Sequence, residues 1–180
     1  MRFWHGPDHL WLELDAPYSG RMSAQELDTM VGRLRETIDR GELRDPRVRL
    51  AIADRKTDAY IGGVSRYWED RDTLWASVGV NIHDSERWGR GLGFEALGLW
   101  IEYLFAAFPD WVRVGCTTWS GNERMMGLAR KLGLEEEARI RMARVYRGEH
   151  FDSVGYGILR TEWEALYPDG FAAALAARRG

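Results

Sequence analysis

The chain has little cysteine and no long hydrophobic run, and each shortage excludes a class of protein. Its one cysteine, Cys116, cannot form an intrachain disulfide. The first residues have no apolar core of the kind found in a secretory signal. Together these features favour a reducing, cytoplasmic compartment. No apolar segment approaches the ~20 residues that a membrane span needs, so we expect no membrane partner.

Charge of either sign is also not in large excess. Lys and Arg total 25 against 28 Asp and Glu, a formal net charge of −3, which argues against a nucleic-acid partner. No His or Cys pair has zinc spacing, so we predict no metal. With 45% hydrophobic and 29% charged residues, the composition is typical of a soluble globular protein. We predict one domain over residues 1–180, with an irregular N-terminal segment (1–22) and a C-terminal tail helix (163–180).

Helical and strand patterns alternate along the chain. Ser23 and Glu26 have capping-box spacing, and Gly41 is a C-terminal cap for the helix that follows them. The apolar stripe of that helix is Leu27, Met30, Val31, Leu34 and Ile38. Further helices are expected over 94–108 and 122–132, and strands over 48–53, 60–68, 74–82, 112–119, 138–146 and 152–160. The mixture predicts an α/β or α+β domain with helices packed on a mixed sheet.

The strand expected over 74–82 has the clearest alternation. Its apolar positions occur at every second residue, so one face is expected to be buried. These positions are Leu74, Ala76, Val78, Val80 and Ile82.

The strongest chemical signal is the glycine-rich join between that strand and the next helix. Gly89, Gly91 and Gly93 alternate within the segment from Trp88 to Gly93. Glycine lets backbone N–H groups turn toward one point, and a helix N-terminus adds positive potential. The loop therefore predicts a phosphate or pyrophosphate site, to which Arg90 could add a charge-assisted contact. A tight turn without a ligand is the alternative. The spacing does not fit a Rossmann or a Walker loop.

Two segments together resemble the GNAT N-acetyltransferase superfamily. Asn81-Ile82-His83, four residues, and then the loop from Trp88 to Gly93 resemble its acyl-CoA pyrophosphate loop. The segment from Asn122 to Leu134 resembles its Asn-to-Leu-Gly-Phe helix. The Trp-Gly-Arg-Gly start and the hairpin ending in Tyr156-Gly157-Ile158-Leu159 are most similar to the branch that includes the ribosomal-protein N-acetyltransferases. The resemblance covers roughly residues 23–162.

The resemblance implies a fold and a reaction. The fold is a mixed, mostly antiparallel sheet with helices on both faces and splayed strands at the acyl-CoA site. The reaction is transfer of acetyl from acetyl-CoA to a primary amine by direct attack in a ternary complex. A backbone N–H near Asn81 to His83 would polarise the thioester carbonyl. The implied cofactor-binding residues are Asn81, Ile82, His83, Trp88, Gly89, Arg90, Gly91, Leu92, Gly93 and Asn122.

The chain departs from the family where catalysis is concerned. The tyrosine that protonates the leaving thiolate in many members would fall at Ala129, a common serine is Met125, and a glutamate of some members would fall at Thr117. The first loop position is Trp88, and the family's first strand is either missing or degenerate in the short irregular segment before Ser23. Three functions therefore stay open: an acetyltransferase for a protein N-terminus, one for a small amine such as a polyamine or antibiotic, and a non-catalytic acyl-CoA-binding module.

The sequence leaves the catalytic residues unassigned and offers two candidates. His83 is either a base for the amine or an exposed strand end. Asn122 either contacts the pantetheine arm or only caps its helix. Cys116 is expected to be a buried, inert thiol. Acidic residues that either bind a cationic substrate or form polar turns are Glu69, Asp70 and Glu86.

The tryptophans and one arginine-rich stretch carry the remaining hypotheses. Five tryptophans could line a cleft for a cationic amine, with packing in the core or in a homodimer as the alternative: Trp4, Trp11, Trp68, Trp75 and Trp119. Four arginines form either a solvated, ion-paired face or a contact for an acidic protein partner: Arg139, Arg141, Arg144 and Arg147.

Overall fold

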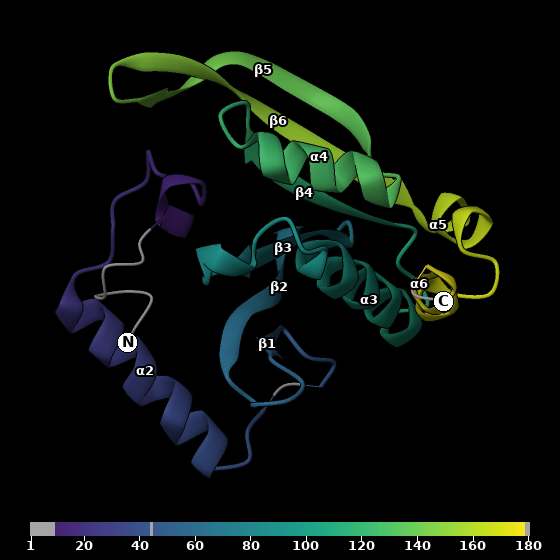
Figure 1. The fold of residues 1–180 in the computed structure, drawn as a ribbon, viewed down its shortest axis with the longest axis horizontal. Helices are drawn as coiled ribbons and strands as arrows, with labels where there is room; N and C mark the ends of the chain where they lie inside the picture. The colour runs from purple at the N-terminus through teal and green to yellow at the C-terminus, as the bar shows by residue number, and fades with distance from the viewer. Residues whose placement is uncertain (1–9, 44, 179–180) are drawn as a thin grey trace.

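The structure, a computed structural model, describes residues 10–43 and 45–178. Thirteen helices and strands follow one another in these residues (Figure 1). They are η1 (Leu10–Glu13), α2 (Ala24–Asp39), β1 (Arg49–Ala53), β2 (Tyr60–Asp70), β3 (Trp75–Ile82), η2 (Ser85–Arg87), α3 (Leu92–Ala107), β4 (Arg113–Trp119), α4 (Glu123–Leu132), β5 (Glu135–Tyr146), β6 (Glu149–Leu159), α5 (Arg160–Leu166) and α6 (Phe171–Ala177).

The six strands form one open sheet in the order β1-β2-β3-β4-β6-β5. Every neighbouring pair is antiparallel except β3 and β4, which are parallel because α3 crosses over between them. The predicted fold class, a mixed and mostly antiparallel sheet with packed helices, is confirmed.

The parallel contact at the centre of the sheet is very short. Strands β3 and β4 are paired only at Ser77 and Gly115. Beyond that pair, β3 stays bonded to β2 as far as Ile82, and β4 stays bonded to β6 as far as Trp119. The two halves of the sheet therefore diverge toward the carboxyl ends of β3 and β4, so the predicted splay is present.

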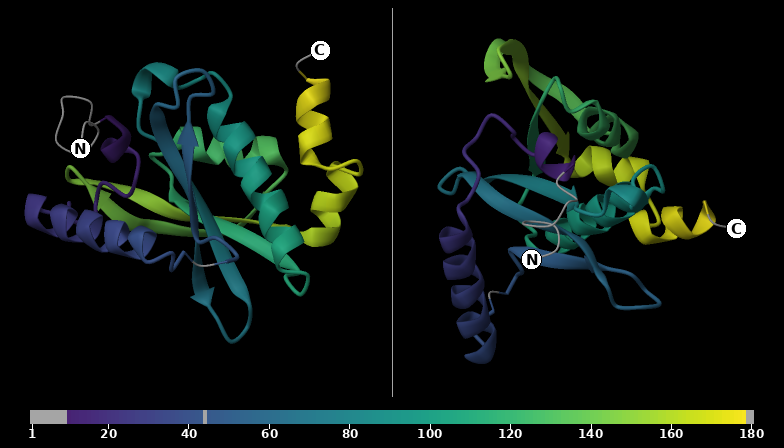
Figure 2. Two further views of the ribbon diagram at one scale, coloured as in Figure 1. Left: turned by 90° about the horizontal axis from the view of Figure 1, so that it is seen from below. Right: turned by 60° about the vertical axis from the view of Figure 1, so that its left-hand side comes forward.

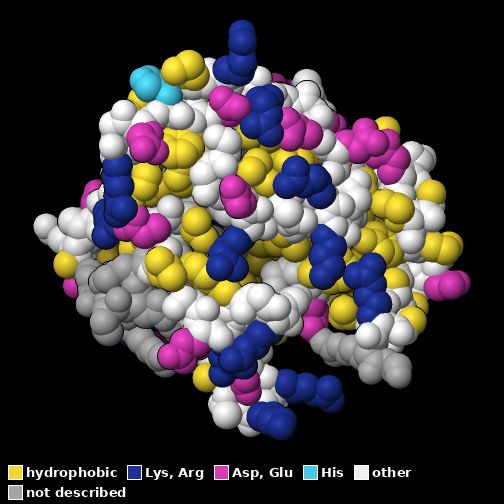
Figure 3. Space-filling view, turned by 45° about the horizontal axis from the view of Figure 1, so that its top comes forward, with side chains coloured by type: hydrophobic (Ala, Val, Ile, Leu, Met, Phe, Trp, Pro, Cys, Tyr) yellow, Lys and Arg dark blue, Asp and Glu magenta, His cyan; other side chains and the backbone are white. Residues whose placement is uncertain are grey.

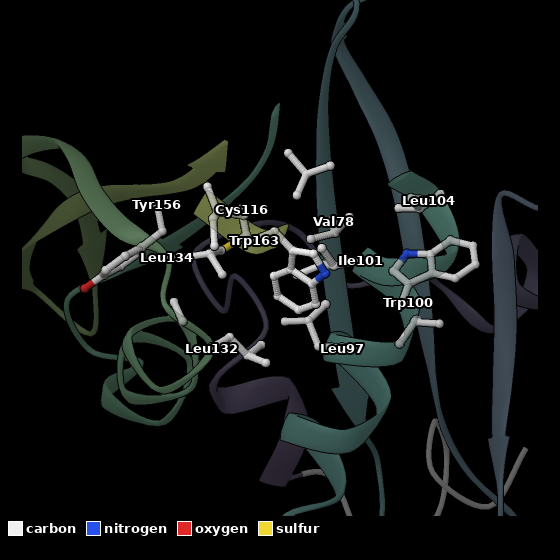
Figure 4. Close-up of a cluster of buried hydrophobic side chains, with 14 of the residues drawn as sticks. Val78, Leu97, Trp100, Ile101, Leu104, Cys116, Leu132, Leu134, Tyr156 and Trp163 are labelled. Carbon is white, nitrogen blue, oxygen red and sulfur yellow. The ribbon is translucent and has the colours of Figure 1, made fainter. Parts of the chain in front are cut away.

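Helices α3 and α4 contact each other and cover one side of the strands, and α6 packs against α3. Helix α2 lies on the other side of β2 from α3 in all three ribbon views (Figures 1 and 2). The core lies beneath α3 and α4, where Val78 and Cys116 of the central strands meet Leu97 and Ile101 of α3 (Figure 4). Burial of such side chains contributes roughly 1.5–3 kcal/mol each.

Helix α2 begins where its capping box predicts, but only part of its apolar stripe is buried. The capping box of Ser23 and Glu26 is formed, and Gly41 follows the helix with a φ of +66°. Of the apolar stripe, Leu27 is buried, whereas Leu34 and Ile38 are more than half exposed. Apolar residues at helical spacing indicate that a helix has an apolar face, but they do not indicate how much of that face another element covers.

Three other expectations need correction. Leu74 is exposed, with a φ of +56°, and lies in the turn before β3 instead of on its buried face. Strands β5 and β6 each begin three residues earlier than expected. The tail carries two short helices, α5 and α6, where one was predicted. Residues 10–22 hold a 3-10 helix and no strand, while residues 1–9, 179 and 180, with Trp4, lie outside the described residues.

Close packing between α3 and α6 gives a stability test. An added Cβ at Gly98 would lie 2.1 Å from the Phe171 ring, which is fully buried among Trp163 and Tyr167. We expect Gly98→Ala to lower the free energy of unfolding by about 1–3 kcal/mol, as overpacking does. Chemical denaturation measures this value.

The matched control is Gly32→Ala in α2, where a Cβ meets nothing within 4 Å. Helix propensity should make that variant more stable by up to about 1 kcal/mol. Equal stabilisation by both substitutions would contradict the packing described for α3 and α6.

Candidate functional site

A cavity of about 350 Å³ opens where the two halves of the sheet diverge. Its walls are the end of β3, the loop from Trp88 to Gly91, the start of α3, one face of α4, and residues 11, 14 and 15 of the N-terminal segment. The elements that line it are therefore far apart in the sequence.

The glycine-rich loop has the backbone geometry that its glycines predict. Gly89 and Gly91 adopt φ values of +75° and +82°, and a Cβ on either would meet no protein atom within 4 Å. Gly91 is the N-cap of α3 and has no side chain to cap the first amides. The Trp88 indole Nε1 donates to the Ile82 carbonyl at 2.7 Å, which ties the loop to β3. The first N–H groups of α3 are thus left for a ligand or water.

Every second residue of β3 points its backbone N–H and C=O groups toward the gap between β3 and β4. The His83 N–H already donates to the Ile61 carbonyl of β2 at 2.9 Å. Because the groups of an antiparallel strand alternate between its two sides, the amides of Ile82 and Val80 face β4 instead. Within the segment from Asn81 to His83, where a backbone N–H was expected to face the thioester, the Ile82 N–H is therefore the one that faces the gap, and Val80 was missed.

Most of the predicted cofactor-binding residues line this cavity, and two do not. Those that line it are Asn81, Ile82, Trp88, Gly89, Gly91, Leu92, Gly93 and Asn122. His83 and Arg90 are not among the lining residues, and Arg90 is exposed. Arg124 and Lys131 were missed, although with Leu128 they recur at spacings of four and three residues, which places all three on one face of α4.

Basic side chains surround the loop end of the cavity. The Arg124 guanidinium lies 5.0 Å from the Trp88 ring centre, and the Lys131 ammonium 4.9 Å from that of Phe94. Basic groups are also interspersed with hydrophobic surface on the face seen in Figure 3. Each contact leaves a positive charge beside the open amides, where it would attract an anion.

Arg87 also lines the cavity, but its charge is already compensated. It donates to Asp54 at 2.6 Å and to Asp84 at 3.2 Å. The hydrogen bond with Asp54 raises the pKa of Arg87 and holds the pKa of Asp54 well below its usual range. This residue therefore fixes the loop to the turn after β1.

Asn122 combines two structural contacts at the mouth of the cavity. Its Oδ1 accepts the Met125 N–H at 3.0 Å, which confirms the predicted N-cap. Its Nδ2 donates to the Leu14 carbonyl at 3.0 Å, and the Trp119 indole donates to the same carbonyl at 3.0 Å. Asn122 therefore anchors the N-terminal segment to the β4 half of the sheet.

His83 lies in an apolar site and not at an exposed strand end. Its ring centre is 4.3 Å from that of Trp11 and 5.5 Å from that of Tyr60, and the residue is 5% exposed. Burial lowers the pKa of His83 to about 4. This packing favours a structural role over the role of base.

Other residues singled out from the sequence lie away from the cavity. Cys116 is buried as predicted, and burial raises the pKa of its thiol to about 12. Glu69 accepts from the Ser77 hydroxyl at 2.8 Å, and Asp70 accepts two backbone N–H groups of its turn. Arg139 pairs with Glu136 and Asp152, so that part of the basic stretch is ion-paired.

The three positions at which the chain lacks a catalytic residue type of the family have different surroundings. Ala129 is fully buried in the core, Met125 lines the cavity, and Thr117 is exposed on β4.

Within residues 10–43 and 45–178, no group of three or more His, Cys, Asp or Glu side chains is placed to hold a metal ion. In the same part of the chain, none of the helices combines the length and apolar character that crossing a bilayer requires.

Comparison with known proteins identifies the family. A family model described as an acetyltransferase (GNAT) domain matches residues 4–135. The chain therefore belongs to the GNAT acetyltransferase family and is an acyltransferase. A search of curated proteins gives no match.

Solved structures share the fold at low identity. A spermidine N-acetyltransferase from Vibrio cholerae, in complex with CoA and spermine, has a TM-score of 0.67 at 15% identity, covering 87% of this chain and 86% of that one. A GNAT-family acetyltransferase from Bacillus anthracis has a TM-score of 0.63 at 14% identity, covering 88% and 86%. A protein provisionally named a ribosomal-protein-serine acetyltransferase, from Vibrio cholerae, has a TM-score of 0.56 at 22% identity, covering 77% and 76%.

The buried His83 predicts a dependence of stability on pH. Its pKa of about 4 lies below the ~6.5 of an unfolded histidine, so the unfolded chain binds the proton more readily. Above pH ~6.5 His83 is neutral in both states and should not lower the free energy of unfolding. As the pH drops from there toward 4, His83 should lower that free energy by up to about 1.4 kcal/mol per pH unit.

Urea denaturation of the wild type and His83→Gln between pH 8 and pH 4 checks this expectation. The variant should lose stability at pH 8 but show a shallower decline below pH 6.5. Parallel declines in the two proteins would show that His83 does not titrate as described.

Proposed function

We propose that the cavity binds acetyl-CoA and that the protein transfers the acetyl group to a primary amine. One observation carries the proposal: a loop with open amides, the basic side chains of Arg124 and Lys131, and the unpaired edge of β3 all line the same cavity. Each feature suits one part of CoA. The open amides suit its pyrophosphate, the basic side chains suit its phosphate-bearing sugar, and the edge of β3 suits its amide-rich arm.

In this arrangement the pyrophosphate binds the N–H groups between Trp88 and Gly93, with Arg124 and Lys131 beside it. The amides of the pantetheine arm pair with the gap-facing backbone groups of Val80 and Ile82, in the place that a neighbouring strand would take. One of those N–H groups polarises the thioester carbonyl, as oxyanion-hole donors do.

The reaction itself is a direct displacement. The neutral amine nitrogen attacks the carbonyl carbon, a C–N bond forms, the C–S bond breaks and the CoA thiolate leaves. Ala129, at the position of the family's tyrosine, is buried and its methyl side chain has no proton to donate. The thiolate therefore takes its proton from water. The nitrogen loses one proton in the same sequence.

For the acceptor we propose a protein N-terminus, as in the ribosomal-protein N-acetyltransferase branch. The Trp-Gly-Arg-Gly loop and the likeness to the ribosomal-protein-serine acetyltransferase support this choice. A polyamine is the second candidate, because the spermidine acetyltransferase with the same fold was solved with spermine. A non-catalytic acyl-CoA-binding module is the third.

We place the protein in the cytoplasm, where its thiol Cys116 would stay reduced.

Replacement of Gly91 tests the cofactor site. We expect Gly91→Val to weaken CoA binding by at least about tenfold, because a side chain would cover the open amides and disfavour the positive φ. Isothermal titration of the folded variant with CoA measures the affinity.

Gly148 provides a matched control, since it has the same φ of +82° but lies in the β5–β6 turn. Gly148→Val should carry a similar conformational cost and bind CoA as the wild type does. Unchanged affinity in Gly91→Val, or equal losses in both variants, would refute the proposed cofactor site.

An acceptor panel tests the substrate. Release of free thiol from acetyl-CoA should occur with peptides that have a free N-terminus and should stop when that N-terminus is acetylated, because the α-amine is then no longer a nucleophile. Peptides with an internal lysine and spermidine serve as comparisons. Turnover of spermidine alone would favour the polyamine acetyltransferase, and no turnover with any amine would favour the binding module.

A further inference from the structure

Asp15 lies on a wall between two cavities. One is the cavity described above, and the other, of about 240 Å³, lies between the N-terminal segment and the start of α2. Trp11 and Asp15 line both, and Leu27 of α2 lines the second. The second cavity therefore reaches the same point as the first, but from the α2 side of the sheet.

The position of Asp15 is fixed by contacts on both halves of the sheet. Its N–H donates to the Trp11 carbonyl at 3.0 Å, and Trp11 is buried against His83. The preceding carbonyl, that of Leu14, accepts from both Trp119 and Asn122 on the β4 half. The carboxylate itself accepts from the Asn81 side chain of β3 at 3.2 Å.

The charges around the first cavity are divided between its two ends. Among the described residues that line it, Asp15 carries the sole carboxylate, whereas Arg87, Arg124 and Lys131 lie toward the loop and α4. A phosphate-bearing donor would be drawn to the basic end, which leaves the carboxylate at the end where β3 and β4 diverge.

In the second cavity the basic side chain is already paired. Arg21 donates to Glu13 at 3.1 Å, and Glu13 also accepts from Arg147 at 2.8 Å. Partial withdrawal from water raises the pKa of Asp15, against the lowering effect of the bond from Asn81.

We propose that Asp15 is the acceptor-binding residue: its carboxylate binds the ammonium of a primary amine that enters through the second cavity and takes the proton that the amine releases. The inference rests on the proposed acetyl transfer and names the side from which the acceptor comes. The CoA thioester occupies the gap between β3 and β4, and the amine meets it from the α2 side.

The step balances without another reagent. The ammonium first loses one proton to water and stays hydrogen-bonded to Asp15. The nitrogen attacks the thioester carbon, and the carboxylate accepts the second proton as the C–N bond forms. The C–S bond then breaks, the thiolate is protonated by water, and Asp15 returns its proton to solvent.

The test compares Asp15→Asn with the wild type in the peptide assay and in CoA titration. We expect kcat/KM for a cationic amine to fall by about 10²-fold or more, with CoA affinity unchanged. An aromatic amine, which is uncharged at neutral pH, should show a smaller loss in the same variant. Asp15→Glu should recover part of the rate.

Glu13→Gln is the matched control, because Glu13 lies in the same segment but its carboxylate binds Tyr146, Arg147 and Arg21 outside the first cavity. It should keep kcat/KM within about threefold, as exposed ion pairs contribute little. Equal losses in Glu13→Gln and Asp15→Asn would mean that the segment only supports the fold, and would overturn the proposal.

Calorimetry of the peptide on the CoA-loaded protein gives a readout that needs no turnover. Weaker binding by Asp15→Asn than by the wild type supports the role of Asp15. Equal binding, or equal kcat/KM, contradicts it. Failure of the proposed acetyl transfer is distinct, because it would appear as loss of CoA binding or of thiol release in the wild type itself.

Discussion

The contact between β3 and β4 is limited to one residue pair, Ser77 and Gly115. Beyond that pair each strand has a hydrogen-bonded neighbour on one side alone, and backbone groups buried without partners are costly. The chain meets this constraint in part with its own groups: the Trp88 indole donates to the Ile82 carbonyl of β3. What remains is an open backbone edge, with which the arm of CoA pairs in our proposal.

The N-terminal segment is hydrogen-bonded to both sides of this opening. Leu14 is bonded to the β4 half and Asp15 to Asn81 of the β3 half. Two consecutive residues of a segment that belongs to neither half-sheet therefore contact both halves. The segment also lines both cavities, and in our proposal the donor and the acceptor meet beside it.

The sequence predicted what depends on local conformation. The turn geometry of Gly89 and Gly91, the Asn122 cap and the open mixed sheet follow from residue types a few positions apart. The role of residues 11–15 could not be predicted, because it rests on contacts with Asn81, Trp119 and Asn122 that are more than 60 positions away in the chain. His83 was misplaced for the same reason: the sequence shows a polar residue at a strand end, and the buried Trp11 that covers it comes from that distant segment.

The central claim is that the gap between β3 and β4 is the acyl-CoA site. A crystal structure of the protein with CoA tests it most directly. Our account predicts the pyrophosphate on the amides from Trp88 to Gly93, the pantetheine arm bonded to Val80 and Ile82, and the sulfur at the end of the cavity nearest Asp15. CoA bound elsewhere, or β3 and β4 closed into a continuous pair along their length, would contradict it.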